Sequence, residues 1–378
     1  MRPPPQTAPR IASADAHAPS AAAWGRLAVA VGEGLSRDLP GARLGILYAT
    51  PTLADKLEEV LAVVRRVSGI PDWVGAVGHG IVGGSEQFYG AGLSALALDL
   101  PADSYRLLPH LTGDLAPMGE HAAWIAAKRP SFGIVHADPS AADASETIAG
   151  IAEASEAFLV GGLTVAAPDG AQIAGKVVAG GVSGLLFANS VAVATGLTQG
   201  CVPAGPLHRV TAADGNVLIG LDGQPALDVM KQDLNPENLA QLKAFAAEMQ
   251  IGLPIPGSDT GDYLVRDFTG IDTREGLIGV AALVDPGDRL FFARRDQGAA
   301  IEDMIRMSEQ LHRRAPRASG GLYFSCVARG PRLFGNDTSE RDLIRDSFGA
   351  MPVAGVFCNG EISNARLYAY TGVLAVFA

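Results

Sequence analysis

Charged and polar side chains stand at the ends of several apolar runs in this sequence, where the chain becomes glycine-rich. They are His79, Asp138 and Arg329, with Asn359 and Glu361 in the segment NGE. Ligands of α/β proteins bind where strands deliver their carboxyl ends to loops, so we expect these side chains to line a site. Arg329 set against Glu361 and Asp138 suits a zwitterionic or other small polar ligand. The alternative is that Arg329 and Glu361 only pair with each other and cap turns.

The segment QGCVPAGP, residues 199–206, predicts a stiff loop, because its glycines allow close approach and its prolines fix the path of the chain. We expect this loop, with Gln199 and Cys201, to border the site. Cys201 is also a candidate nucleophile, with His208 or His79 as its base. That arrangement would make the protein a hydrolase or transferase acting on an ester, amide or thioester. A lone cysteine is more often structural, so we interpret Cys201 as part of a pocket wall.

Sequence motifs for cofactors and metals are weak. Residues 78–83 match GxGxxG after a predicted strand, but the glycine-rich continuation cannot open the helix that a dinucleotide needs. The histidines form no pair at helical spacing, and the three cysteines include no CxxC. Cys326 and Cys358 lie within predicted apolar strands, and we interpret them as packing residues. We therefore expect no metal and no cofactor.

Composition limits the classes of partner. The chain has 378 residues and a net charge of −11, without a basic cluster that could hold nucleic acid. Its N-terminus has no apolar signal-peptide core, and no run approaches the roughly 18 apolar residues of a membrane span. These features predict a cytoplasmic protein of two domains that binds neither nucleic acid nor membrane.

A pattern of strand, helix, strand ending in glycine, and strand occurs three times, beginning near residues 44, 131 and 320. Short apolar strands alternating with helices predict an α/β fold with mixed β-sheets flanked by helices. Residues 1–21, rich in proline and alanine, predict a flexible arm. Residues 262–296 predict three antiparallel strands, and a domain boundary is expected between residues 210 and 235.

The segment QGCVPAGPLHRVTAADGNVLIGLDGQPALDV resembles the FIST family of sensory domains, as do GHGIVGG, HADPSA, LVGGL, LYFSCVARG and VAGVFCNGEI. The resemblance covers residues 22–378 and implies a FIST N-type α/β module over 22–225 and a FIST C-type α/β module over 226–378. It places family motif glycines at Gly161 and Gly162, which join the expected ligand-binding residues. It also implies a small-ligand-binding sensory protein whose ligand is an amino acid or similar metabolite.

No output segment accompanies these modules, so we expect signalling through a separate partner protein. We expect a binding protein rather than an enzyme. A Cys201-dependent enzyme or a protein-binding adaptor remains the alternative.

Overall fold

The computed structural model describes residues 8–84, 86–166, 170–237, 241, 248–255 and 262–378. Its residues form two compact units. The first unit joins the chain up to Thr198 with Asp303–Ala378, and the second is Gln199–Glu302. The second unit therefore interrupts the first in sequence, and each is described separately below.

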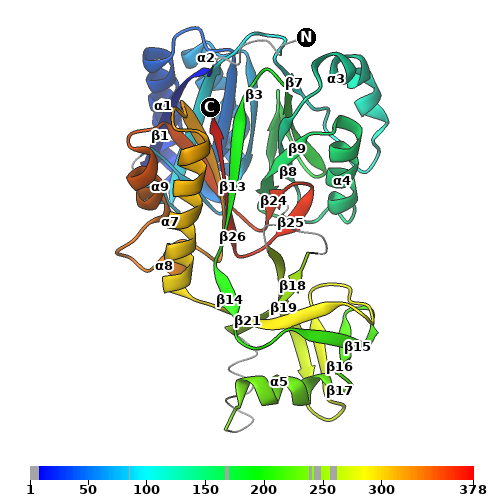
Figure 1. Cartoon of the computed structure of the whole chain (residues 1–378). Coiled ribbons are helices and arrows are strands. Elements are labelled where there is room, and N and C mark those ends of the chain that lie inside the picture. Colours follow the sequence, from blue (N-terminus) through cyan, green and yellow to red (C-terminus); the bar gives the residue numbers. More distant parts are fainter. Residues whose placement is uncertain (1–7, 85, 167–169, 238–240, 242–247, 256–261) are drawn as a thin grey trace. The chain divides into compact units, whose positions relative to one another are not determined.

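The first unit contains three six-stranded sheets with the same strand order. Figure 1 shows strands of these sheets flanked by helices. The first sheet comprises β1 (Arg10–Ala18), β6 (Ala91–Asp99), β2 (Leu44–Ala49), β3 (Asp72–Val77), β10 (Gln172–Ala174) and β11 (Val177–Val178). The second comprises β7 (Tyr105–Leu107), β12 (Val182–Phe187), β8 (Phe132–Ala137), β9 (Phe158–Leu163), β24 (Glu361–Ser363) and β25 (Arg366–Tyr368). The third comprises β13 (Val193–Gln199), β26 (Thr371–Phe377), β22 (Gly320–Cys326), β23 (Val353–Cys358), β4 (Gly80–Val82) and β5 (Gln87–Phe88). In each sheet the two central strands are parallel.

Each repeat completes the sheet of another repeat. The hairpin that follows β3 pairs with β23, the hairpin that follows β23 pairs with β9, and the hairpin that follows β9 pairs with β3. This cyclic exchange makes the three repeats one structure, because no repeat can complete its own sheet. The repeats predicted from the sequence are confirmed, and the second unit is an insertion between β13 and the helix α7 (Gln297–Arg314) of the third repeat.

Helices cover the outer faces of the sheets. α1 (Trp24–Asp38) and α2 (Leu57–Ser68) pack on the first sheet, and α3 (Ala122–Lys128) and α4 (Ala144–Ser155) pack on the second. The third sheet has α7, α8 (Pro331–Phe334) and α9 (Glu340–Phe348) in its repeat. Short 3₁₀ turns precede three of these helices at Ala21–Ala23, Pro51–Lys56 and Ala116–His121.

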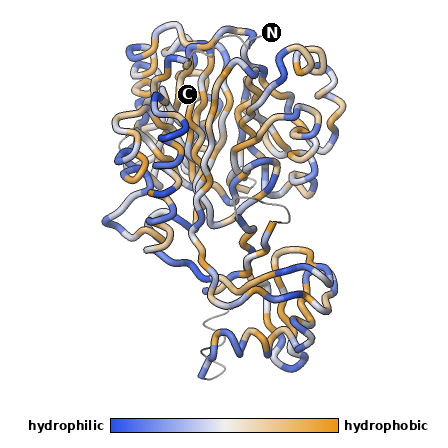
Figure 2. The backbone as a smooth tube through the Cα atoms, in the orientation of Figure 1, coloured by the Kyte–Doolittle hydropathy of each residue, from blue (hydrophilic) through white to orange (hydrophobic). Residues whose placement is uncertain are grey.

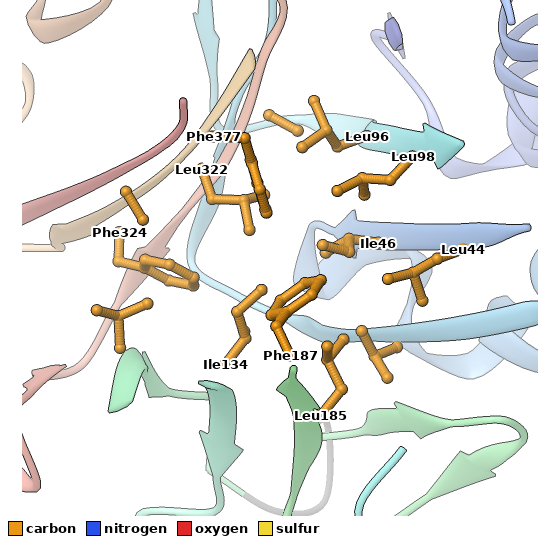
Figure 3. Close-up of a cluster of buried hydrophobic side chains, with 14 of the residues drawn as sticks. Leu44, Ile46, Leu96, Leu98, Ile134, Leu185, Phe187, Leu322, Phe324 and Phe377 are labelled. Carbon is orange, nitrogen blue, oxygen red and sulfur yellow. The ribbon is translucent and has the colours of Figure 1, made fainter. Parts of the chain in front are cut away.

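The inner faces of the three sheets share one hydrophobic core. Leu44 of the first sheet, Ile134 of the second and Phe324 of the third lie in the same buried cluster, and Figure 3 shows their side chains directed toward a common centre. The tube in Figure 2 is correspondingly apolar along the central strands and more polar along the helices. Removing this apolar surface from water supplies the main driving force that joins the repeats.

The second unit is built mainly from antiparallel strands that close on themselves. They are β14 (Cys201–Pro203), β15 (His208–Asp214), β16 (Val217–Leu221), β17 (Gln224–Pro225), β18 (Met249–Pro254), β19 (Tyr263–Asp272), β20 (Leu277–Val280) and β21 (Arg289–Arg295). The circuit forms because β21 pairs with both β15 and β18. α5 (Ala226–Leu234) packs on the apolar core of this unit through Leu227 and Met230.

Three expectations from the sequence need correction. Residues 10–18 are not a loose arm: β1 pairs along its whole length with β6, and Ala12 is buried beneath α1. Residues 199–206 are not wholly loop, because Cys201–Pro203 forms β14 against β21. The three strands predicted over 262–296 exist, but β21 pairs with β14, β15 and β18 rather than with β20.

The division into compact units differs from the expected modules. The junction between residues 225 and 226 falls inside the second unit, between β17 and α5.

Candidate functional site

The three repeats meet at the carboxyl ends of their central strands through a cyclic set of backbone hydrogen bonds. In each repeat, an N–H just beyond the second central strand donates to a carbonyl of another repeat. The pairs are His79 to Phe357 (2.8 Å), Val165 to Val77 (3.1 Å) and Asn359 to Leu163 (3.2 Å). His79 and Asn359, both expected from the sequence to line a site, therefore occupy equivalent positions at this junction.

Three rings occupy equivalent positions in the core just below this junction. Tyr48, His136 and Phe324 come from the first, second and third sheets, and their ring centroids lie 5.6–6.4 Å apart. Burial lowers the pKa of His136 to about 3, so its imidazole is neutral at physiological pH. His136 Nε2 shares a 3.2 Å hydrogen bond with the Tyr48 hydroxyl, while its Nδ1 is buried without a partner.

Strand register places Glu361 beside His136 with Gly162 between them. His136 pairs with Gly162 in the parallel ladder, and Gly162 pairs with Glu361 in the antiparallel ladder. A Cβ at Gly162 would collide with the Cys358 Sγ, which fills the space above the glycine. Gly162 thus lets a thiol from β23 lie between an imidazole and a carboxyl group.

Glu361 is completely buried and only half satisfied. Its Oε2 accepts hydrogen bonds from the Thr371 hydroxyl (2.7 Å) and the Thr371 N–H (3.2 Å), while its Oε1 has no partner. Burial raises the pKa of this carboxyl group to about 8, against the opposing effects of Thr371 and Arg329. Glu361 is therefore mainly protonated at neutral pH and is poised to ionise if a cation approaches.

The equivalent position of the first sheet holds Gln172, which has no such deficit. Gln172 Nε2 donates to the carbonyls of Gly180 and Gly181 (both 3.1 Å), and its Oε1 accepts from the Ser183 hydroxyl (2.5 Å). The third sheet carries the apolar Ile81 there, opposite Val356. The strand order shared by the three sheets thus does not require an unsatisfied carboxyl group at the position of Glu361.

A buried ion pair lies beside Glu361. Arg329 Nε donates to Glu340 Oε1 over 2.8 Å, and neither side chain is exposed. The same carboxylate accepts from the Tyr323 hydroxyl (2.5 Å) and from the Ser325 hydroxyl (2.9 and 3.0 Å). Burial disfavours the charged guanidinium, but Glu340 more than compensates and raises the pKa of Arg329 above its ordinary value.

Two successive residues connect Arg329 to Glu361. Arg329 Nη1 donates to the Tyr370 carbonyl (3.4 Å), and Thr371 holds Glu361. Tyr370 adopts φ = +63°, a conformation that costs a non-glycine residue on the order of 1–2 kcal/mol. Arg329 Nη2 is buried without a partner, like Glu361 Oε1. The Arg329–Glu361 cluster, defined as Arg329, Glu340, Glu361 and Thr371, thus holds one unpartnered guanidinium donor and one unpartnered carboxyl oxygen, which becomes an acceptor when Glu361 ionises.

Tyr89 is a partly exposed side chain that interacts electrostatically with Glu340 of this cluster. It is 41% exposed, and its ring centroid is 4.9 Å from that of Phe357. Its hydroxyl lies where a Cβ at Gly330 would stand, and Gly330 follows Arg329 directly. His79, half-buried next to Gly80 beneath the Tyr89 ring, has an unpartnered Nε2. Burial, and secondarily Arg332, lowers the pKa of His79, so its imidazole is neutral.

The remaining expected residues of the first unit have structural contacts. Asp138 is buried at the end of β8, where its Oδ1 accepts from the Ser140 N–H (2.7 Å) in the turn before α4. Gly161 has φ = +150°, and a Cβ there would collide with the Val135 carbonyl oxygen. In place of the alternative pairing of Arg329 with Glu361, the structure has an ion pair between Arg329 and Glu340.

Gln199 and Cys201 belong to the second unit. Gln199 Nε2 donates to the Tyr263 carbonyl (2.9 Å), and the Tyr263 hydroxyl donates to the Cys201 carbonyl (2.6 Å). Cys201 is 3% exposed, and its Sγ lies 3.9 Å from the Gln250 Oε1. Both ring nitrogens of His208, the candidate base in this unit, contact carboxylates, those of Asp222 (2.7 Å) and Asp233 (2.8 Å).

Sequence reasoning missed Glu340, Thr371 and the role of Tyr370. Glu340 follows the helix cap Ser339, where an exposed glutamate is ordinary, so nothing local indicated its burial. Within the described ranges, no cluster of three or more histidine, cysteine or acidic side chains could hold a metal ion. The described helices include none with the length and apolar character of a membrane span.

Comparison with known proteins identifies related chains. Residues 43–224 match the FIST N domain, and residues 226–364 match the FIST C domain. An uncharacterized protein of Mycobacterium tuberculosis (strain ATCC 25618 / H37Rv) is 34% identical over 201 residues, which are 50% of this chain and 51% of that protein. An uncharacterized protein of Mycobacterium bovis (strain ATCC BAA-935 / AF2122/97) is 31% identical over 192 residues, 48% of this chain and 49% of that protein. The chain thus spans about half the length of these relatives, and its two domain matches show that it belongs to the FIST family.

Proposed function

We propose that this protein is a sensory protein that binds a small zwitterionic ligand, such as an amino acid, at the Arg329–Glu361 cluster. The observation that carries the proposal is the pair of buried, unpartnered atoms Arg329 Nη2 and Glu361 Oε1. An unsatisfied buried polar group costs about 1–3 kcal/mol, and more when it is charged, so two such groups in one cluster favour a ligand that satisfies both. FIST domains are associated with sensory signal transduction, which agrees with a binding role.

The chemistry of the cluster selects both ends of such a ligand. The ligand carboxylate accepts from Arg329 Nη2 in a charge-assisted hydrogen bond, and the ligand ammonium donates to Glu361 Oε1. Glu361 then ionises, because a cation at hydrogen-bond distance lowers its pKa from about 8. Binding therefore releases a proton at neutral pH.

In this proposal the ligand reaches the cluster by displacing Tyr89, whose hydroxyl lies against Gly330, the residue after Arg329. Displacement of one partly exposed side chain is a small change that binding energy can support. It also provides a signal, because the Tyr89 ring packs on Phe357 at the junction of the repeats. In this proposal the bound state is recognised by a separate partner protein in the cytoplasm.

Calorimetric titration with the common amino acids tests the proposal. A bound ligand at about 100 times its dissociation constant stabilises the native state by roughly 2.7 kcal/mol, so a thermal-shift screen first selects the compounds. Below pH 8 the affinity should fall about tenfold for each pH unit, because Glu361 must lose its proton to bind the ammonium group. Titrations in buffers of different ionisation enthalpy should report the released proton.

The variant Glu361→Gln removes the charge and keeps the shape. It should abolish both the binding and its pH dependence, whereas Glu153→Gln, on an exposed position of α4, should change neither. Tyr89→Ala should accelerate association. A compound that binds Glu361→Gln and the unaltered chain equally well would place the ligand elsewhere, and failure of all amino acids to bind would refute this choice of ligand.

A further inference from the structure

A second feature of the first unit, distinct from the Arg329–Glu361 cluster, is an open cavity of about 390 Å³. This volume lies within the roughly 300–1,000 Å³ range of small-molecule sites. Its walls come from β1, the end of α1, the first turns of α9 and the segment that follows α9. Ile11, Ala350 and Met351 supply apolar surface, and the charged lining residues are Arg341, Arg345 and Asp38.

The guanidinium of Arg341 is fixed in the cavity wall. Its Nε donates to the carbonyls of Gly83 (3.2 Å) and Gly84 (2.9 Å), and its Nη2 donates to the Met351 carbonyl (3.3 Å). Gly84 and Met351 themselves line the cavity, so the guanidinium is held between two of its walls. Arg341 is 2% exposed, yet its Nη1 has no hydrogen-bond partner. The side chain is therefore a pre-oriented donor that lacks an acceptor.

The charge of Arg341 is also uncompensated by a direct ion pair. Among the ion pairs between described residues, Arg341 appears in none, although Arg345 pairs with Asp342 and Asp38 pairs with Arg37. Asp15 interacts with Arg341 electrostatically, but its Oδ1 accepts the Gly84 N–H over 2.7 Å. A buried guanidinium without a contacting carboxylate is costly, and an anion in the cavity would remove that cost.

We infer that this cavity binds a small organic anion, whose carboxylate or phosphate group accepts from Arg341 Nη1. Arg345 lines the same cavity, and its charge is balanced by Asp342, so Arg341 is the arginine that lacks an anion. The apolar lining residues favour a ligand with a short apolar body. Glu340 and Arg341 are adjacent on α9. Glu340 pairs with Arg329 and Arg341 lines this cavity, so the first turn of α9 contributes a residue to each of the two sites.

Binding of butyrate and of inorganic phosphate to the full chain tests the inference, with chloride at matched ionic strength as the reference. Arg341→Lys keeps the charge but loses the planar fork, and Ala350→Trp adds a bulky side chain to the cavity lining while leaving Arg341 in place. We expect saturable binding of at least one probe, weaker by about tenfold or more in Arg341→Lys and lost in Ala350→Trp. Arg313→Ala, which removes an exposed arginine of α7, should leave binding unchanged.

The two sites are separable in this experiment. Glu361→Gln should retain butyrate or phosphate binding, since Glu361 is not part of the cavity. The inference is overturned if neither probe binds saturably, or if Ala350→Trp binds as well as the unaltered chain. It is also overturned if a folded Arg341→Lys variant binds with unchanged affinity. If Arg341→Lys does not fold, Ala350→Trp alone decides.

Discussion

Replacement of Glu361 by glutamine should change how the stability of the protein depends on pH. The carboxyl group has a pKa of about 8 in the folded chain, raised by burial from its ordinary value of 4.5. Between these values the folded state holds one proton that the unfolded state has released. Its contribution to stability is therefore fully present below pH 4.5 and is lost as the pH rises toward 8.

The magnitude follows from one proton of difference. The free energy of unfolding of the unaltered chain should fall by about 1.4 kcal/mol for each pH unit in this window, relative to that of Glu361→Gln. Glutamine fits the site, because its oxygen can accept the two hydrogen bonds from Thr371, and Gln172 already occupies the equivalent position of the first sheet. All other titrating groups are common to both chains and cancel in the difference.

Urea denaturation at half-unit intervals from pH 5.5 to 9 measures this difference. The advantage of Glu361→Gln should grow steadily up to about pH 8 and then level off. Parallel stability curves for the two chains across pH 5.5–7.5 would show that Glu361 is ionised in the folded state and would refute the reasoning. Carbon-13 titration of the Glu361 carboxyl in the unaltered chain provides an independent measurement that does not depend on the variant.

Three further predictions concern other contacts of the two units. Glu340→Gln leaves Arg329 charged and buried, and should cost about 3–5 kcal/mol in urea unfolding, whereas Glu153→Gln on exposed α4 should cost almost nothing. Gly162→Ala should destabilise the chain because its Cβ collides with Cys358 Sγ, and adding Cys358→Ala should recover part of the loss; additive effects would contradict the contact. Burial opposes the charged form of His208, but the carboxylates of Asp222 and Asp233 prevail and raise its pKa. The stability from this pairing is therefore complete below pH 6.5 and declines as the pH rises through the raised pKa. An imidazole proton resonance of His208 that titrates below pH 6.5 would contradict this.

The repeats could be predicted from the sequence because their signals are local. Runs such as Leu44–Ala49 and Phe132–Ala137 are mainly apolar and buried. In each sheet, the second of the two central strands carries a glycine where another backbone lies very close, as at Gly161. The exchange of hairpins could not be predicted in the same way. β24 pairs with β9 across about 200 residues, and a three-residue strand carries too little pattern to specify its partner.

The same limit explains the errors at the ends of elements and the missed site residues. β1 is rich in alanine and contains few large apolar residues, a composition typical of a loose segment. Its nine-residue pairing with β6 supplies the backbone hydrogen bonds that order it. The insertion of the second unit between β13 and α7 has no marker in composition, so composition does not predict these two compact units. Glu340 is buried only because Arg329, Tyr323 and Ser325 surround it, and that is a property of tertiary structure.

The strongest argument that the Arg329–Glu361 cluster serves a function comes from comparison within the chain. The three sheets have one strand order, and the same register position carries Ile81, Gln172 and Glu361. Two of these side chains have all their interactions satisfied: Ile81 packs in the apolar core, and Gln172 makes three hydrogen bonds. A glutamine at position 361 would fit the fold equally well. Because it does not ionise, it would avoid the loss of stability that a buried carboxyl group causes as the pH rises. Proteins that keep a costly polar group where a neutral one would fit commonly do so at sites of function. A Glu361→Gln chain that is more stable but no longer binds ligand would show directly that Glu361 lowers stability in return for ligand binding.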